Sequence, residues 1–195
     1  MAEKELQQLS ETQRSRHIAR FVEILDVTLT DVSARLLAPA PGAPAKNLFF
    51  SYDVVPKYFL NEETRRLAVS LRFNVLISVG EDDPHTEVFF MKCGYVIGYE
   101  FTAVGGPPKE QHDLLFMPFA KINGLYNIWP FFRELVHSTT MRMGIPPMTL
   151  PALKMQDDGT FNQQQGPSIP GSHVALPANA SRPKRRALKR KKSAR

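Results

Sequence analysis

The five histidines and the single cysteine are the side chains best suited to bind a metal ion or to act as a nucleophile. The histidines are His17, His85, His112, His137 and His173. No two of them lie three to five residues apart, the spacing that lets neighbouring histidines share one metal ion. Cys93 has no second cysteine for a disulfide or a zinc site, and its aromatic-rich surroundings predict a small buried apolar side chain. We expect neither a metal nor a cofactor.

Two further segments look like binding loops but lack the groups that such loops need. The acidic turn at 81–83 has no spaced oxygen ligands around a central glycine, so it does not predict a calcium loop. Gly105-Gly106-Pro107-Pro108 has no following Lys-Ser/Thr, and its prolines carry no amide hydrogen to bind a phosphate. The sequence also lacks the nucleophile motif Gly-x-Ser-x-Gly. We identify no catalytic residues and expect that the protein is not an enzyme.

The aromatic residues are the unusual feature, because the chain has 13 Phe and 5 Tyr. Successive strand residues point to opposite faces, so helices on one face cannot cover both Phe49 and Phe50. Rings left uncovered would meet solvent, another subunit or an extended apolar peptide. The candidates for binding such a peptide are Phe49, Phe50, Tyr52, Phe89, Tyr95 and Tyr126. Ordinary core packing or a subunit interface is the alternative for each of them.

Four segments have the alternating pattern of β-strands: 21–35, 47–55, 66–79 and 86–101. The third is the clearest, since apolar residues occupy every second position from Leu67 to Val79. Mostly polar residues lie between them, so one face of this strand should be buried and the other solvated. The short polar turn that follows predicts an antiparallel hairpin with the fourth segment. A proline-rich crossover at 38–46 joins the first two strands.

Helical spacing replaces alternation after residue 108. Residues 114–119 predict a short helix broken near Pro118 or at Asn123-Gly124, and residues 125–143 predict a long amphipathic helix. Pro130 is expected in the first turn of the long helix, and Gly144 is expected to end it. Strands grouped before helices predict an α+β fold, a four-stranded antiparallel sheet with helices packed on one face.

The two ends of the chain differ in composition from the middle. We interpret residues 1–20 as a polar arm forming a frayed helix, 21–155 as the folded domain and 156–195 as a disordered tail. The first residues lack the apolar core of a secretory signal, and no apolar run is long enough to span a membrane. We therefore expect a cytoplasmic protein.

The positive charge is concentrated in the tail. Nine of the 25 Lys and Arg residues lie in 182–195, so the remaining 16 are outnumbered by 19 Asp and Glu residues. The tail residues expected to act through charge are Lys184, Arg185, Arg186, Lys189, Arg190, Lys191 and Lys192. They could bind nucleic acid, anionic lipid or acidic client segments, or only keep the chain in solution. The run contains no aromatic residue, so base stacking is not expected.

Several segments resemble SecB, the bacterial export chaperone. Asn-Ile-Trp-Pro-Phe-Phe-Arg-Glu at 127–134 is similar to the family's aromatic-Pro-aromatic helix start with its Arg-Glu pair, and Gly-Ile-Pro-Pro-Met-Thr-Leu at 144–150 to the extension that follows. Residues 71–81 resemble the family's third strand, and Gly94 its fourth. The resemblance covers roughly 21–153. It is closer to the SecB-like chaperones of toxin–antitoxin–chaperone systems, which share the Pro-Pro-x-Thr-Leu pattern.

The resemblance implies an ATP-independent chaperone, or holdase, that binds unfolded polypeptides in apolar grooves. Its clients would be preproteins kept translocation-competent for protein export, or an antitoxin whose folding it supports. The resemblance also implies a homotetramer, built as a dimer of dimers. The family docks the motor SecA partly through acidic residues on its sheet. Here Asp31 keeps one acidic position, but Arg35 and Phe89 occupy two others, which leaves SecA docking open.

The alternative function is that of a nucleic-acid- or acidic-surface-binding protein that acts through the basic tail, with the folded domain as an oligomerisation platform. A small enzyme or ligand-binding domain would need a constellation of polar residues that the sequence does not display.

Overall fold

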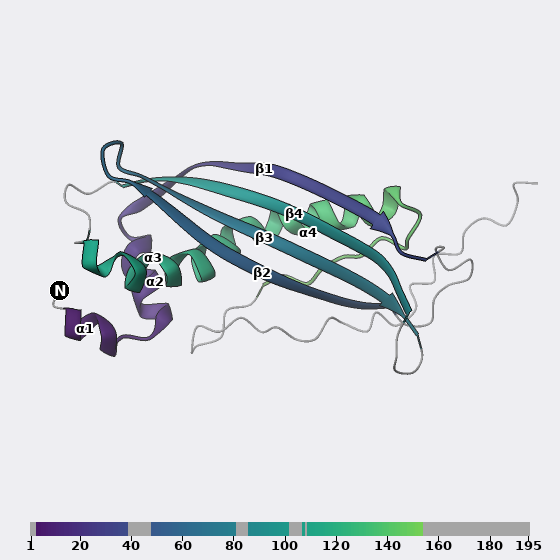
Figure 1. Ribbon diagram of the computed structural model, residues 1–195, viewed down its shortest axis with the longest axis horizontal. Coiled ribbons are helices and arrows are strands. Elements are labelled where there is room, and N and C mark those ends of the chain that lie inside the picture. Colours follow the sequence, from purple (N-terminus) through teal and green to yellow (C-terminus); the bar gives the residue numbers. More distant parts are fainter. Residues whose placement is uncertain (1–2, 39–47, 81–85, 102–106, 108, 154–195) are drawn as a thin grey trace, which may run out of the picture.

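The computed structural model describes residues 3–38, 48–80, 86–101, 107 and 109–153. Two short helices come first, four long strands follow, and a helical segment precedes a final extended stretch (Figure 1). The elements are α1 (Glu3–Gln8), α2 (Glu11–Ala19), β1 (Val22–Leu36), β2 (Leu48–Asn61), β3 (Arg66–Val79), β4 (Thr86–Phe101), a 3₁₀ turn (Lys109–Gln111), α3 (His112–Phe119), a π-helical turn (Ala120–Gly124) and α4 (Leu125–Arg142).

The four strands form one antiparallel sheet in the order β1-β4-β3-β2. The helices lie on one face of this sheet, and Figure 1 shows α4 running behind the strands. The predicted α+β architecture is therefore confirmed. β2 is longer than the predicted segment 47–55, since it continues to Asn61.

The core lies between the helices and the face of the sheet that they cover. Alternate residues of β3, from Leu67 to Ile77, are at most 1 % exposed, as their period-two pattern predicts. Aromatic rings join the two layers: Phe73 of β3 stacks on Phe132 of α4, with ring centroids 4.1 Å apart. Such aromatic pairs stabilise the fold beyond the burial of their apolar surface.

β1 contains two β-bulges, and each one brings an aspartate over a glycine of β4. The register of β1 against β4 shifts once between Ile24 and Asp26 and again between Leu29 and Asp31. The amide N–H of Gly98 donates a hydrogen bond of 3.1 Å to the Asp26 carboxylate, and an added Cβ at Gly98 would lie 2.8 Å from the same oxygen. A Cβ at Gly94 would lie only 2.4 Å from Asp31 Oδ1. A side chain at either position would therefore force the aspartate carboxylate to move, which favours glycine at both.

The other edge of the sheet, β2, carries a proline near its middle. Pro56 pairs with Leu71 of β3, and as an edge residue it can lack an amide hydrogen without breaking the ladder. Lys57 is exposed beside it. Proline and lysine are residues that discourage further strands from adding to an edge.

The helical segment after residue 111 is continuous, which differs from the predicted break. Neither Pro118 nor Asn123-Gly124 ends the helix; instead a π-helical turn at Ala120–Gly124 joins α3 directly to α4. Pro130 is consequently in the second turn of α4, and the prediction that it lies in the first turn is wrong. The carbonyl it would leave unpaired belongs to Tyr126, whose side chain is 54 % exposed, so water can reach this part of the helix.

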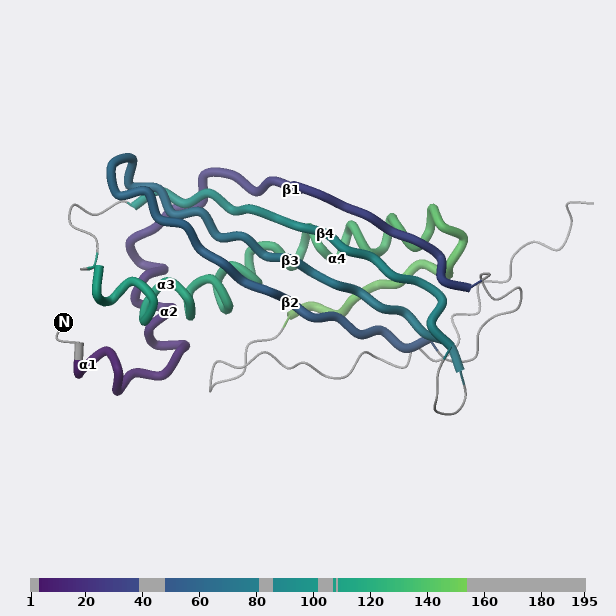
Figure 2. Tube along the Cα trace, in the orientation of Figure 1, coloured from purple at the N-terminus to yellow at the C-terminus, as the bar shows by residue number. Residues whose placement is uncertain are grey.

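The segment after α4 folds back along the helix. Gly144, at φ 73°, ends α4 as predicted, and the amide of Ile145 bonds to the carbonyl of Thr140. Figure 2 shows the chain then turning back beneath α4. Trp129 Nε1 donates to the carbonyl of Pro151 at 2.9 Å, and Arg133 Nε donates to that of Leu150 at 2.6 Å.

The N-terminal residues pack on the helical layer and do not form a frayed arm. Ser10 caps α2 in a capping box with Gln13, and Leu6 and Ile18 are each only 1 % exposed. Ser15 donates a hydrogen bond to Asn123 in the π-helical turn. Among the described residues of this segment, Leu6, Leu9, Ile18 and Ala19 all pack in or against the core.

Some predicted features lie outside the described residues: most of the crossover 38–46, the turn at 81–83, and the tail 156–195 with its basic residues Lys184, Arg185, Arg186, Lys189, Arg190, Lys191 and Lys192. Within the described part of the chain, no helix combines the length and the apolarity needed to cross a membrane.

Candidate functional site

An apolar row on the edge strand β1 is the main candidate for a binding surface. Seven residues of β1 pair with residues of β4 whose side chains are buried on the helix-side face: Val22, Ile24, Val27, Leu29, Val32, Ala34 and Leu36. All seven are apolar, and we call them the β1 row. Paired residues of an antiparallel sheet point to the same face, so the β1 row lies on the side of the sheet that carries the helices.

The two bulges keep the β1 row on one face. The row uses even-numbered positions at Ile24, odd-numbered positions at Val27 and Leu29, and even-numbered positions again from Val32 onward. In a regular strand this change of parity would turn Val27 and Leu29 to the opposite face. Each bulge inserts one extra residue and so restores the orientation.

The helices leave much of the β1 row uncovered. Ile24 is 50 %, Leu29 42 %, Val32 47 % and Leu36 43 % exposed, whereas the β4 residues with which they pair are buried. The cause is the strand order, because β1 is an edge and α4 packs against the neighbouring strands. Exposed apolar side chains gathered on one strand are typical of interaction sites, which makes the β1 row a candidate.

One flank of α4 borders the same strip of the sheet. The Tyr95 hydroxyl of β4 donates to the carbonyl of Phe131, and Asn127 donates to the Tyr99 hydroxyl at 2.9 Å. The side chain of Phe131 is itself 50 % exposed. The β1 row and this side of α4 therefore lie on either side of the buried tyrosines of β4.

Three of the six predicted peptide-binding aromatics lie in the core. Phe50 is 7 %, Phe89 0 % and Tyr95 4 % exposed, which differs from the expectation that they are available to a peptide. Their side chains point to the helix-side face, where β2, β3 and β4 are covered. Phe89 also cannot occupy a docking position on the outer face beside Arg35, because the residue that pairs with Arg35 is Phe90.

The other three predicted aromatics are more accessible but do not converge on one site. Tyr52 is half-buried against Trp129, with ring centroids 5.4 Å apart, so it belongs to the edge of the core. Phe49 is half-buried on the opposite face of β2, and Tyr126 is 54 % exposed on α4. The sequence signal for the β1 row was present in the apolar residues of segment 21–35, but those residues could not be recognised as exposed before the strand order was known.

The titratable residues of the core are held in their neutral forms. Burial, with a smaller contribution from the negative charge of Asp31, raises the pKa of the Cys93 thiol to about 12. Burial also raises the pKa of Tyr99 to about 12, although the hydrogen bond from Asn127 opposes this effect. A neutral thiol is a poor nucleophile, so the prediction that Cys93 is a buried apolar side chain is confirmed. Among the described residues, no three His, Cys, Asp or Glu side chains gather as a metal ion would need.

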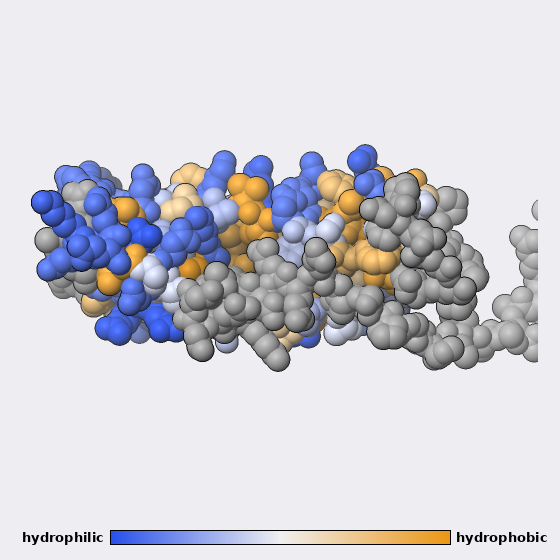
Figure 3. All heavy atoms as spheres, turned by 90° about the horizontal axis from the view of Figure 1, so that it is seen from below, coloured by the Kyte–Doolittle hydropathy of each residue, from blue (hydrophilic) through white to orange (hydrophobic). Residues whose placement is uncertain are grey.

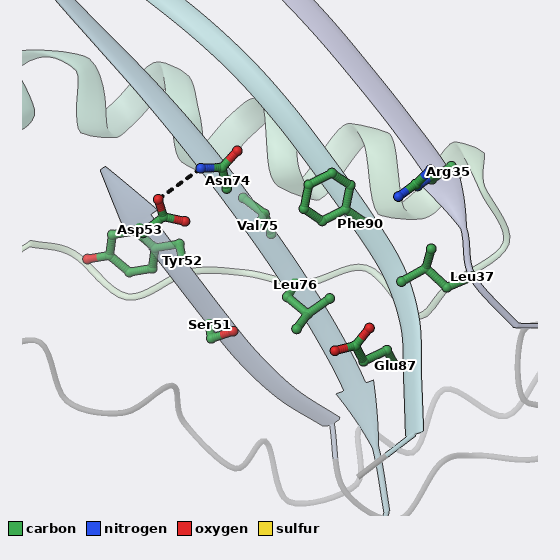
Figure 4. Close-up of a pocket in the computed structure, with 10 residues that line it drawn as sticks. All are labelled: Arg35, Leu37, Ser51, Tyr52, Asp53, Asn74, Val75, Leu76, Glu87 and Phe90. Carbon is green, nitrogen blue, oxygen red and sulfur yellow. Dashed lines mark hydrogen bonds between the residues drawn. The ribbon is translucent and has the colours of Figure 1, made fainter. Parts of the chain in front are cut away.

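The outer face of the sheet, opposite the helices, carries a second feature. Near one end of the strands a hollow of about 540 Å³ lies over the side chains of Arg35, Leu76, Glu87 and Phe90 (Figure 4). In Figure 4 α4 is visible behind the sheet, so the hollow opens on the side without helices. The Asn74 amide donates a 2.8 Å hydrogen bond to Asp53 at its rim.

The surface is divided between polar and apolar regions. Figure 3, which views the molecule from below the orientation of Figure 1, shows hydrophilic residues crowded at the end that holds α1 and α2. Hydrophobic residues reach the surface in patches along the rest of the molecule. The exposed apolar side chains of the described residues therefore lie mainly along the strands and α4.

Comparison with known proteins identifies the fold. No protein-family model matches the chain, and no curated protein matches it either. The solved structure of the Mycobacterium tuberculosis Rv1957 SecB-like chaperone, in complex with a ChAD peptide from the Rv1956 HigA1 antitoxin, is similar with a TM-score of 0.64 and 21% sequence identity, covering 74% of this chain and 100% of that chain. A protein of unknown function from Streptococcus agalactiae is more distant, with a TM-score of 0.37 and 11% identity over 67% of this chain and 96% of that one. The first likeness, together with the four-stranded antiparallel sheet and its helices, shows that the chain has a SecB-like fold.

Proposed function

We propose that the protein is an ATP-independent chaperone, a holdase that binds unfolded polypeptides through the β1 row. The observation that carries this proposal is the exposure of Ile24, Leu29, Val32 and Leu36 on the unpaired edge of a SecB-like sheet. A holdase has to bury apolar side chains of its client, and all seven residues of the β1 row are apolar.

The energetics suit weak and reversible capture. Full burial of an aliphatic side chain contributes about 1.5–3 kcal/mol, and since these four residues are already about half buried, each can still contribute roughly half of that. Several such weak contacts along one strand can hold a chain without fixing its sequence.

The assembly we propose is a homotetramer, a dimer of dimers. An edge strand can extend a sheet across two subunits through its backbone groups, and the side chains of the β1 row would then stay on the helix-side face, open to a client. Phe49, Tyr52 and Tyr126, the accessible members of the predicted aromatic set, stay proposed as further client contacts.

The clients we propose are unfolded chains, either preproteins for export or an antitoxin. The chaperone that shares this fold binds an antitoxin peptide, which favours an antitoxin among these clients. The outer face gives little support for SecA docking, because the Asp31 carboxylate folds over Gly94 and accepts a hydrogen bond from Thr30.

The test is suppression of aggregation. A urea-unfolded client protein is diluted into buffer without nucleotide, and light scattering is followed with and without the full chain. We expect wild type to suppress scattering and Leu29→Ser with Val32→Ser to lose most of that activity. Val55→Ser with Phe59→Ser is the matched control, because it removes exposed apolar side chains from the outer face of the other edge.

Two outcomes count against the proposal. If wild type in excess leaves aggregation unchanged, the protein is not a holdase. If the β1-row variant changes only the mass of the assembly, measured by light scattering of the purified protein, and keeps full activity, the row is a subunit interface and clients bind elsewhere.

A second candidate function rests on the nine Lys and Arg residues of 182–195. Through them the protein would bind nucleic acid or another acidic surface by charge alone. Such binding weakens steeply as salt rises, and we expect it to disappear when 182–195 is deleted. Binding of an oligonucleotide that withstands both changes contradicts this function.

A further inference from the structure

We propose that the hollow on the outer face of the sheet is a second docking site, which binds a peptide segment of a partner protein in which an acidic residue stands next to a large apolar one. The site lies on the face opposite the β1 row, so it is separate from the proposed client surface. Its main lining residues are Arg35, Leu76 and Phe90, and Lys92 adjoins it through the Phe90 ring; we call it the Phe90 hollow.

A bend of the sheet creates the hollow. The register of β3 against β4 shifts between Ile77 and Ser78, so β4 has one extra residue there, and the strands curve strongly at this end in Figure 1. Four residues in one cross-strand row, Ser51, Leu76, Phe90 and Arg35, then form its base from β2 to β1. The row is apolar in the middle and polar at both ends.

Two cations stand over the same aromatic ring. The guanidinium carbon of Arg35 is 5.3 Å, and the ammonium nitrogen of Lys92 5.4 Å, from the centroid of Phe90. Neither cation forms an ion pair with a described residue. The ring stabilises each of them, and among the described residues no side chain accepts a hydrogen bond from either cation. A carboxylate bound beside the ring would accept charge-assisted hydrogen bonds from them.

The remaining lining favours one particular kind of ligand. Leu76 and Phe90 are half-buried and offer an apolar floor next to the cations. In Figure 4 Leu37 lies between Arg35 and Glu87, and Glu87 lies near Leu76. A ligand with a single acid followed by an apolar group fits this order, whereas a polyanion would meet both Glu87 and Asp53.

The shape of the hollow favours an extended peptide over a small molecule. Its lining comes from all four strands, and it is open along the flat face of the sheet (Figure 4). Small-molecule sites enclose most of the surface of their ligand. A peptide lying across the strands can instead make contacts from Arg35 to Ser51.

The experiment uses the full chain and two fluorescein-labelled peptides. One has Asp-Phe pairs separated by Gly-Ser spacers, and the other has Lys-Phe pairs in the same frame. We expect the Asp-Phe peptide to bind at least about tenfold more tightly. Arg35→Glu with Lys92→Glu is expected to weaken its binding about 10–100-fold. Lys57→Glu, on the same face but outside the hollow, is the matched charge control and should have little effect.

The controls separate this site from the proposed client surface. The β1-row variant Leu29→Ser with Val32→Ser should still bind the Asp-Phe peptide, even where it no longer suppresses aggregation. Should the charge-reversed variant not fold, amide chemical shifts of Phe90 and Leu76 in the wild-type chain are expected to move on titration.

Three results overturn the proposal: equal affinity for the two peptides, unchanged binding in the charge-reversed variant, or loss of binding in the β1-row variant. An oligonucleotide that binds with the same dependence on Arg35 and Lys92 would also overturn it, because the ligand class would then be a polyanion.

Discussion

The substitution Gly98→Ala tests whether the aspartate of the first β-bulge in β1 favours glycine at this position of β4. Gly98→Ala places a Cβ 2.8 Å from Asp26 Oδ1, closer than real contacts of this kind, so the carboxylate has to move away. The hydrogen bond from the Gly98 amide to that carboxylate is then lost. Because this bond holds the first bulge, we expect the substitution to act on β1 as well as on β4.

The magnitude follows from two opposing effects. A hydrogen bond to a charged group contributes about 1.5–3 kcal/mol, and the Asp26 carboxylate is exposed, so the lower end of that range applies. Alanine in a strand is favoured over glycine by about 0.5–1 kcal/mol. We therefore expect Gly98→Ala to lower the free energy of unfolding by about 1 kcal/mol.

The assay is a double-mutant cycle in urea. Asp26→Ala removes the clashing carboxylate, so in that background Gly98→Ala should be neutral or stabilising. A coupling free energy of about 1 kcal/mol or more between the two positions is expected. If Gly98→Ala has the same effect with and without Asp26, the carboxylate does not determine the need for glycine, and our reading of the bulge is refuted.

Three further predictions concern the core. Phe132→Ala should lower the free energy of unfolding, measured by urea titration, by about 3–5 kcal/mol, because Phe132 is fully buried. The side chain of the adjacent Phe131 is half exposed, so Phe131→Ala should change it by less than about 1 kcal/mol. Equal effects would contradict the assigned orientation of α4. The fluorescence of Trp129, the single tryptophan, should have its maximum at short wavelength. Trp129→Phe should make the segment after α4 more sensitive to protease, because the hydrogen bond from the indole N–H to the Pro151 carbonyl is lost. Unchanged cleavage would argue against that hydrogen bond. Burial raises the pKa values of Cys93 and Tyr99 to about 12, while their usual values are 9.0 and 10.0, so the unfolded chain ionises first as pH rises. In reducing buffer the free energy of unfolding should keep its full value below pH 9 and fall as the pH rises toward 12. The fall should be less steep in Cys93→Ala. A urea midpoint that does not change with pH over this interval would disprove the prediction.

The sheet could be predicted because its signal is local. The alternation from Leu67 to Val79 fixes which side chains share a face, and the short turn after it leaves an antiparallel partner as the simplest pairing. The bulges at Asp26 and Asp31 could not be predicted in this way. They depend on glycines of β4, which lie far along the sequence and become neighbours only after the strands pair.

The proposed binding surface was harder to predict than the fold. Alternation shows that Phe49 and Phe50 point to opposite faces, but it does not show which face the helices cover. The expected rings Phe89 and Tyr95 are on the covered face of a central strand, and are therefore buried. The β1 row is exposed because β1 is an edge strand, a property of the strand order and not of the local sequence.

The helical segment shows how a local rule can mislead. Proline and glycine usually stop a helix, yet Pro118 and Gly124 lie within one that continues as a π-helical turn. Gly124 is needed there for packing, since an added Cβ would lie 2.7 Å from a methyl group of Val69. The helix continues through these residues because of contacts with the sheet, which the sequence alone does not display.

The two borders of the sheet differ in a way that limits how far the protein can polymerise. β2 has Pro56 and Lys57 midway along it, while β1 has a bulged but proline-free backbone and an apolar face. A molecule in which only one edge strand can pair with another chain can join one second copy. The resulting dimer then has no such edge strand left. A ribbon would need two such edges on each molecule, so this asymmetry limits edge-to-edge assembly to a pair and closes one route to fibrils.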